Sequence, residues 1–381
     1  MNKYTYIFKM LLLSVVGVLL VSCQESDEPK AKQLDPAQTA LIKQFVEGVV
    51  VPTYKSLADN AIELSGLCEE LMKNPSQELV NKACKKWVSA RAYWELSEAF
   101  LYGAAGDYNI DPHIDSWPLQ KNQLDNILKN KDLLDELKEE GPDAKGFASL
   151  GYGLLGFHAV EYMIFRDGQP RKVGEITEPE RIYNAAVAED LARQAIRLEA
   201  SWAGIDKVTA DKKKTLEDAE LLPTMDYGQL MIAAGEQGNS SYKSQKDALV
   251  QILQGASDIS DEVGNTKITD PVNSGNVLDV ESWYSWNSIE DFTDNLRSVR
   301  NAYYGSLDGT VHNHSLATYM AQQHPDLDKE IRTALDHAIK TVAAMPAPFR
   351  NNLTKEATKP AIEACNALLE QIDAAIEAVQ K

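Results

Sequence analysis

The sequence predicts an all-α protein of two helical bundles, each four-helix-bundle-like and related by internal duplication. Three observations predict it. Apolar residues recur every three or four positions along most of the chain, as on the buried face of a helix. No segment alternates convincingly between apolar and polar residues, as a half-buried strand would. Two distant segments, 91–103 and 297–305, each combine an arginine-containing helix with closing aromatic residues and a glycine, which indicates duplication.

The first 22 residues have the pattern of a lipoprotein signal peptide. Lys3 and Lys9 precede an apolar run, and the tetrapeptide LVSC, ending at Cys23, resembles the lipobox of bacterial lipoproteins. We therefore expect Cys23 to become the lipidated first residue, followed by a flexible tether over 23–37. A signal peptide cut without lipidation, or an uncleaved anchor, is the alternative. The expected location is the bacterial cell envelope, with a lipid anchor in the outer membrane and the protein facing the periplasm or the outside.

The first bundle is expected over residues 38–210. Pro52 lies inside its first helical stretch and should bend or break it. The helix that carries His158 is apolar on almost every side, which is typical of a buried helix. The expected helices span 38–73, 77–102, 120–140, 150–165 and 178–202.

The second bundle, residues 211–381, repeats the scheme. Ser288 could cap the helix that begins there. Its expected helices span 241–255, 289–304, 325–345 and 355–381. Three stretches are expected to be irregular, and loops of such length are usually functional or disordered: 104–119, 221–240 and 256–286.

Composition excludes some functions. The formal net charge is −19 and no basic patch stands out, so nucleic-acid binding is not expected. No C-x-x-C motif occurs among the four cysteines, so a thiolate metal site or a thiol redox motif finds no support. Cys68 and Cys84 lie on consecutive expected helices. They either pair in an oxidising envelope or stay buried and unpaired, and the sequence leaves both alternatives open.

Gly156, His158 and Glu161 form the motif G-x-H-x-x-E inside an apolar helix. Burying a carboxylate is costly unless a charge, hydrogen bonds or a metal compensates it. Positions three apart share a helix face, so His158 and Glu161 can reach one ligand. Imidazole with carboxylate suits iron, zinc or manganese, and we predict that both residues bind a metal. The alternative is a hydrogen bond within the core. Two side chains cannot complete a metal shell, so further ligands must come from elsewhere.

Further candidates lie on three segments. Arg91, Glu95 and Glu98 form one stripe on a helix, and Arg91 could neutralise Glu161. The loop after that helix is rich in aspartate, and a third cluster surrounds the start of the helix near residue 288. The predicted ligand-binding residues are Arg91, Trp94, Glu98, Asp115, Trp117, Asn287, Asp291 and Asn295.

Several motifs occur in a fixed order along the chain. They are the lipoprotein start, Arg91…Trp94…Ser97-Glu98…Gly103, Asp115-Ser-Trp-Pro118, G-F-H-A-V-E at 156–161, and Asn287-Ser-x-x-Asp291-x-x-x-Asn295 with Tyr304-Gly305. Together these motifs resemble the imelysin family over roughly residues 38–380. The resemblance implies two bundles related by duplication, a site where they meet, and an envelope protein linked to iron acquisition.

The imelysin family is named for a peptidase, but the sequence lacks the usual protease motifs. Zinc peptidases carry H-E-x-x-H or the inverted H-x-x-E-H, and here Tyr162 replaces the final histidine of the inverted form. We therefore expect a lipid-anchored binding protein that holds iron, another divalent metal or a small ligand between the bundles and serves an envelope uptake system. The alternatives are a metal-dependent peptidase and a structural, partner-binding envelope protein.

Overall fold

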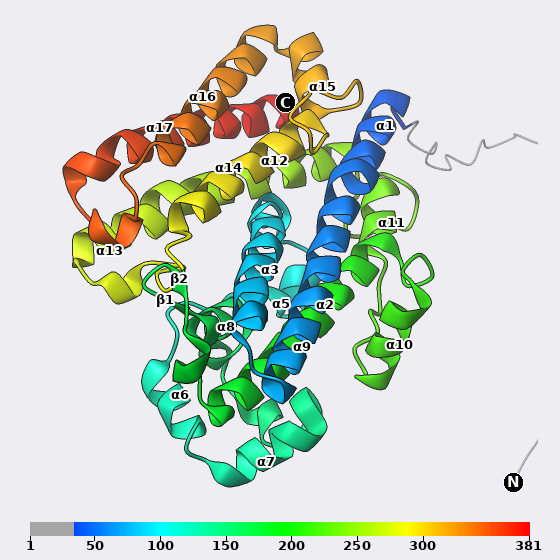
Figure 1. Cartoon of the computed structure of the whole chain (residues 1–381). Helices are drawn as coiled ribbons and strands as arrows, with labels where there is room; N and C mark the ends of the chain where they lie inside the picture. Colours follow the sequence, from blue (N-terminus) through cyan, green and yellow to red (C-terminus); the bar gives the residue numbers. More distant parts are fainter. Residues whose placement is uncertain (1–33) are drawn as a thin grey trace, which may run out of the picture. The chain divides into compact units, whose positions relative to one another are not determined.

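Helices make up nearly all the regular structure of residues 34–381, the part of the chain that the computed structural model describes (Figure 1). A two-stranded antiparallel hairpin, β1 (Phe165–Arg166) and β2 (Gln169–Pro170), is the only sheet in this part. The all-α prediction is confirmed, and the duplication stays a prediction. The signal peptide, Cys23 and most of the expected tether lie outside the described residues. No described helix is long and apolar enough to cross a membrane.

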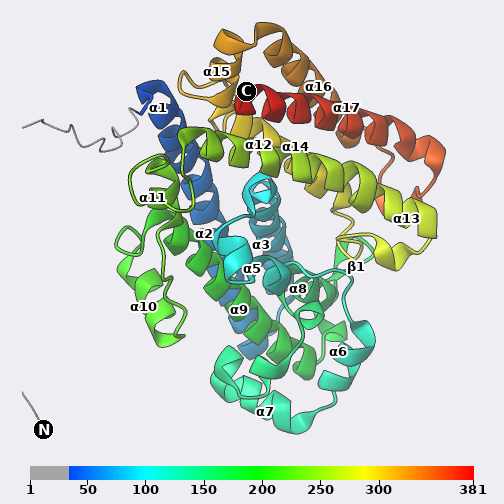
Figure 2. The ribbon, with the colours of Figure 1, turned by 180° about the vertical axis from the view of Figure 1, so that it is seen from behind.

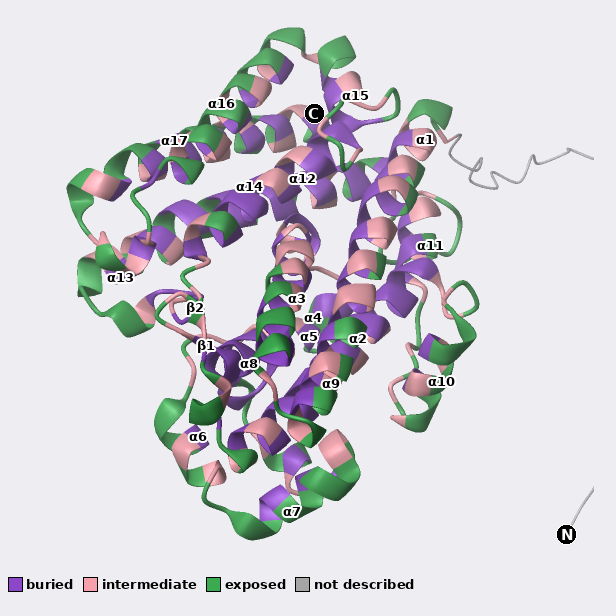
Figure 3. Ribbon diagram, in the orientation of Figure 1, coloured by how far each residue is buried: buried purple, intermediate pink, exposed green. Residues whose placement is uncertain are grey.

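The first helical group is built around α2 (Val51–Lys73). Both α3 (Gln77–Glu95) and α9 (Glu178–Ala203) pack along α2, and α8 (Gly156–Ile164) packs against α3 and α9. A capping box between Thr177 and Glu180 begins α9. Figure 3 shows α8 and much of α9 as buried, which places the predicted metal-binding helix inside this group.

The second helical group contains α12 (Gln245–Glu262), α14 (Ser288–Tyr304), α16 (Pro325–Ala343) and α17 (Lys355–Gln380). In this group α17 packs against α12 and α16, and α14 packs against the same two helices. Both ribbon views place this group beside the end of α3 (Figure 2).

The two groups meet at the end of α3. There α14 packs against α3, and α12 packs against the 3-10 turn Glu98–Phe100. Gly255 permits the second contact, since a Cβ at this position would lie 2.1 Å from the carbonyl oxygen of Ala99. The junction therefore brings the charged stripe of α3 next to the second group.

Pro52 does not break the first helical stretch. The π-helical turn Val46–Val50 joins α1 (Pro36–Phe45) directly to α2, and Pro52 lies in the first turn of α2. The π-helical turn directly before Pro52 accommodates the helix hydrogen bond that proline cannot donate. The stretch is therefore not broken at Pro52, and the alternative that Pro52 bends it stays a prediction.

Four other expected segments also need correction. The helix expected over 120–140 is two helices, α6 (Lys121–Ile127) and α7 (Lys131–Glu140), because the Asn130 side chain caps α7. The segment 256–286 is helical to residue 274, through the rest of α12, the π-helical turn Val263–Ile268 and α13 (Thr269–Ser274). The stretches 104–119 and 221–240 also contain short helices: α4 (Ala104–Asp107), α5 (Ile110–Ile114) and α11 (Tyr227–Ile232).

Peripheral helices complete the described part. Both α10 (Ala210–Asp218) and α11 pack against α9, and α15 (Leu316–Gln323) packs against α16. Cys68 and Cys84 are buried and free, as in the unpaired alternative. The Cys84 thiol donates to the carbonyl oxygen of Ile164, so it contributes to the packing of α3 against α8.

Candidate functional site

The N-terminus of α8 is pressed against the end of α5. Gly156, the first residue of α8, has a φ of +71°, and a Cβ there would lie 2.1 Å from the carbonyl oxygen of Ile114. Only glycine fits both the positive φ and the close approach. Asp115 follows Ile114 directly and His158 lies two residues after Gly156. The glycine of G-x-H-x-x-E therefore brings the Asp115 carboxylate to the His158 ring.

His158 is fully buried between two carboxylates. Its Nδ1 lies 3.3 Å from Glu161 Oε2, and its Nε2 lies 3.0 Å from Asp115 Oδ1. The second contact is an ion pair outside hydrogen-bonding geometry, so Nε2 has no hydrogen-bond partner among the described residues. The Trp117 ring meets the imidazole edge to face at 4.7 Å. His158 Nε2 therefore faces the Asp115 carboxylate and makes no hydrogen bond.

Glu161 is satisfied from the second half of the chain. Its Oε1 accepts hydrogen bonds of 2.7 Å from both the backbone N–H and the hydroxyl of Ser285. Its Oε2 faces His158 Nδ1. Arg91 is paired elsewhere, so the expected neutralisation of Glu161 by Arg91 is wrong.

Arg91 is the centre of a buried ion network. It is fully buried and forms ion pairs with Glu95, Asp115 and Glu281, while its Nε lies 3.8 Å from Asp291 Oδ2. These carboxylates come from α3, the loop after α5, the segment before α14, and α14 itself. One guanidinium thus holds together acids from both helical groups.

Side chains around Arg91 hold the carboxylates in place. Trp94 Nε1 donates to Asp115 Oδ2 at 2.6 Å, and Asn295 Nδ2 donates to Glu95. Asn287 Nδ2 donates to Asp291 Oδ1 at 2.6 Å.

Ser288 has a different role from the expected helix cap. Asn287 is the N-cap residue of α14, and Ser288 is its first helical residue. The Ser288 hydroxyl donates to the backbone carbonyl of Glu281 at 2.5 Å. The expected cap is therefore wrong, and the hydroxyl instead ties the Glu281 segment to α14.

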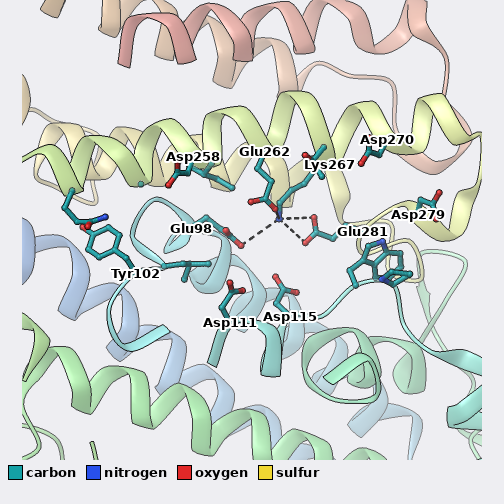
Figure 4. Close-up of a pocket in the computed structure, with 17 residues that line it drawn as sticks. Glu98, Tyr102, Asp111, Asp115, Asp258, Glu262, Lys267, Asp270, Asp279 and Glu281 are labelled. Carbon is teal, nitrogen blue, oxygen red and sulfur yellow. Dashed lines mark hydrogen bonds and ion pairs between the residues drawn. The ribbon is translucent and has the colours of Figure 1, made fainter. Parts of the chain in front are cut away.

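A cavity of about 610 Å³ opens beside this network, between α12 and the segments that follow α3 (Figure 4). Lys267 is the only basic side chain among the described residues that line it. Such an excess of acid attracts cations and repels anions. The lining carboxylates are Glu98, Asp111, Asp115, Asp258, Glu262, Asp270, Asp279 and Glu281.

The buried acids have strongly shifted pKa values. Burial raises the pKa of Glu95 and of Glu98 well above the usual range, and the nearby cations Arg91 and Lys267 offset this only in part. Burial likewise raises the pKa of Asp291 to about 7, although Arg91 lowers it. These carboxyls therefore hold protons under conditions in which exposed ones are ionised.

The pKa values of Asp115 and His158 shift so that the charged form of each group is favoured. Burial opposes ionisation of Asp115, but Arg91 and His158 outweigh it and hold its pKa below the usual range. Burial also opposes a charged His158 ring, but Asp115 and Glu161 outweigh it and raise its pKa to about 9. Without a bound metal, the pair is an imidazolium facing a carboxylate at neutral pH.

Two groups of described residues have ligand atoms close enough to share one metal ion. Asp115, His158 and Glu281 form the first group, and Glu95, Glu98 and Asp115 form the second. Within each group the atoms lie within 4.8 Å of one another. Imidazole with carboxylates fits iron, manganese or zinc. Glu161 belongs to neither group.

The structure gathers the sequence-predicted residues into one region. Arg91, Trp94, Asp115, Asn287, Asp291 and Asn295 make up or support the ion network, Glu98 and Trp117 line the cavity, and His158 and Glu161 lie behind Asp115. Whether they bind a ligand stays a prediction.

Sequence reasoning missed Glu281, Lys267 and Ser285. All three lie in the segment expected to be irregular. Glu281 is an acid directly before a Trp- and Tyr-rich run, which was a usable signal of burial. Nothing in the sequence around Lys267 distinguishes it from a surface lysine.

The family model described as Imelysin matches residues 50–375. The chain belongs to the imelysin family. The described site includes residues from four motifs that carried the resemblance, at 91–98, 115–118, 156–161 and 287–295. The imelysin assignment predicted from the sequence is therefore confirmed.

Other imelysin relatives extend the likeness. The chain is 27% identical to the Iron-regulated protein A of Synechococcus elongatus, with 84% of this chain and 80% of that protein covered. A crystal structure of a candidate iron-regulated protein A precursor from Parabacteroides distasonis is 30% identical, with a TM-score of 0.77 over 92% of this chain and 97% of the other. An imelysin-like protein from Psychrobacter arcticum has the same fold, with 12% identity, a TM-score of 0.61, and 88% and 93% of the two chains covered.

Proposed function

We propose that this imelysin-family protein binds iron, or another divalent metal cation, in the acidic cavity where its two helical groups meet. The single observation that carries the proposal is the group of Asp115, His158 and Glu281, which adjoins a cavity lined by eight carboxylates and one lysine. A cavity of this charge favours a cation over an anionic chelate. Iron is chosen because the names of two relatives describe iron-regulated proteins.

The proposed ligands are His158 Nε2 and one oxygen each of Asp115 and Glu281. Glu161 then orients the ring rather than binding the metal, because its oxygens are taken by His158 Nδ1 and Ser285. A carboxylate behind a histidine ligand fixes the ring and raises its basicity. Glu95 and Glu98 offer a second position that shares Asp115.

Metal titration of two histidine variants tests the proposal. His158→Ala should lose metal binding, whereas His113→Ala should retain it, because His113 pairs with Asp190 and does not line the cavity. The measurement is calorimetric titration with Fe²⁺ under anaerobic conditions, and with Mn²⁺ and Zn²⁺, after treatment with a chelator. Circular dichroism checks that both variants fold. Equal binding by wild type and His158→Ala would refute the proposed site.

The peptidase alternative is separated by a direct assay. The metal-loaded protein is incubated with an unfolded protein substrate, with and without a chelator. Cleavage that the chelator abolishes, and that His158→Ala lacks, would replace the binding proposal with the enzymatic one. We expect no such cleavage.

We also propose that a lipid on Cys23 holds the protein in the bacterial outer membrane, where it serves a metal-uptake system. The sequence pattern around Cys23 supports this part of the proposal. Wild type should incorporate labelled palmitate and sediment with membranes, whereas Cys23→Ala should do neither. Labelled Cys23→Ala, or unlabelled wild type, would contradict it.

A further inference from the structure

We propose that Lys267 is a built-in counter-ion of the cavity, which holds the cation position in the metal-free protein and makes the cavity reject monovalent cations. This inference rests on the proposed cation-binding function and adds its charge selectivity. Lys267 contacts the same Glu281 that belongs to the metal-competent group.

The Lys267 ammonium lies among carboxylates from three elements. Its Nζ is 3.1 Å from Glu281 Oε2, 3.7 Å from Glu262 Oε1 and 3.8 Å from Glu98 Oε1. Figure 4 shows Lys267 reaching from its helical segment toward Glu98 and Glu281. The side chain is only 9% exposed. A buried ammonium is stable only when it is paired, and here the carboxylates replace the water that would otherwise solvate it.

The lysine stays charged in this position. Lysine is charged at neutral pH, and the contacts with Glu281 and Glu262 compensate the burial of the ammonium. The cavity therefore contains a permanent, tethered monovalent cation.

The backbone conformation directs Lys267 toward the cavity. It lies in the π-helical turn Val263–Ile268 between α12 and α13, and such turns are frequent at functional sites. The Thr269 hydroxyl donates to the Gly264 carbonyl at 2.6 Å, across this turn. Deleting one residue of the turn would rotate the side chains that follow by about 100° about the helix axis.

Competition for Glu281 produces the selectivity. A metal bound to Asp115, His158 and Glu281 competes with Lys267, and also with Arg91, for the charge of the Glu281 carboxylate. A free monovalent ion brings the same charge as the ammonium and gains nothing by replacing it. A divalent or trivalent ion has about two or three times the Coulomb attraction at equal distance and can replace it.

The test compares Lys267→Met with Lys212→Met. Lys212 is also a buried lysine, paired with Glu199 and Asp59, and it does not line the cavity. Mn²⁺ affinity is measured by calorimetry in KCl and in choline chloride at equal ionic strength. Lys267→Met should bind Mn²⁺ about tenfold more tightly in choline chloride than wild type and lose this gain in KCl. Wild type and Lys212→Met should respond equally to the two salts. Lys267→Gln, which keeps hydrogen bonds, serves if Lys267→Met does not fold.

The outcomes separate the two proposals. Wild-type binding with unchanged or weaker binding by the Lys267 variants overturns the counter-ion inference and leaves the proposed function intact. Binding by a Lys267 variant alone supports the counter-ion and overturns the function for the natural chain. Absence of binding in all proteins overturns both.

Discussion

Gly156 and Ile114 approach each other so closely that the first has no room for a side chain. A Cβ at residue 156 would lie 2.1 Å from the Ile114 carbonyl oxygen, and the backbone there has a φ of +71°. This contact fixes the distance between α5 and α8, and with it the distance between Asp115 and His158. The glycine of the G-x-H-x-x-E motif, which has no side chain to bind a ligand, thus brings the two parts of the site together.

Gly156→Ala should therefore weaken both the fold and the site. We expect a loss of about 2–4 kcal/mol in the free energy of unfolding, because the obstacle is backbone rather than a side chain that can move aside. Gly66→Ala is the matched control. A Cβ at residue 66 would meet nothing within 4 Å, and replacing a helical glycine by alanine should add about 1 kcal/mol. Urea unfolding measures both, and equal effects would contradict the packing argument.

Glu161→Gln should lower metal affinity without abolishing it. The amide retains the shape of the carboxylate but loses its charge toward His158 Nδ1. Loss of such an orienting carboxylate typically costs about 10–100-fold in metal affinity. The second readout is the His158 pKa, followed by NMR titration of the imidazole in the metal-free protein. In Glu161→Gln the His158 pKa should fall below its wild-type value of about 9. A purely structural role for Glu161 would leave this pKa unchanged.

Metal binding should release protons and strengthen with pH. His158 has a pKa of about 9 in the metal-free protein and can bind a metal only as the neutral ring. Affinity should rise by up to about tenfold per pH unit until pH 9. Calorimetry in buffers of different ionisation enthalpy gives the number of protons released at pH 7, which should be about one per bound metal ion. Affinity independent of pH between 6 and 9 would argue against His158 as a ligand.

The same ionisation affects stability in the opposite direction. Because folding raises the His158 pKa above its ordinary value of 6.5, the stabilisation is complete below pH 6.5 and is lost as pH rises through about 9. In the metal-free protein the wild type should therefore lose its advantage over His158→Gln across this interval. Thermal unfolding of both proteins at several pH values measures the difference.

Arg91→Met should destabilise the protein strongly. The substitution leaves Asp115 and Glu281 buried without their shared counter-charge, which we expect to cost about 3–5 kcal/mol. The loss should shrink at acidic pH, where the carboxyls are protonated. Arg193→Met is the control, since Arg193 pairs with side chains that are 60% and 45% exposed, and such pairs contribute at most about 1 kcal/mol. Similar losses in both variants would show that the network is not the source.

The spacing of residues along the sequence predicted the helices and the faces that their side chains share. The apolar run around His158 predicted a buried helix, and the spacing of Arg91, Glu95 and Glu98 predicted a shared face. The partners of these residues depend on long-range packing that no spacing encodes. Arg91 was expected to reach Glu161 but meets Glu281, 190 positions away. Lys267 reaches the cavity through a π-helical turn, which inserts one residue into a helix and leaves no clear mark in the sequence.

Because of the two hydrogen bonds from Ser285 to Glu161, the site needs residues from both halves of the chain. His158 is oriented by a carboxylate whose own partners lie 124 positions further along the chain. A fragment ending before Ser285 would retain the whole G-x-H-x-x-E motif yet lack the groups that hold its glutamate. Presence of the motif in a shortened chain is therefore no guide to function.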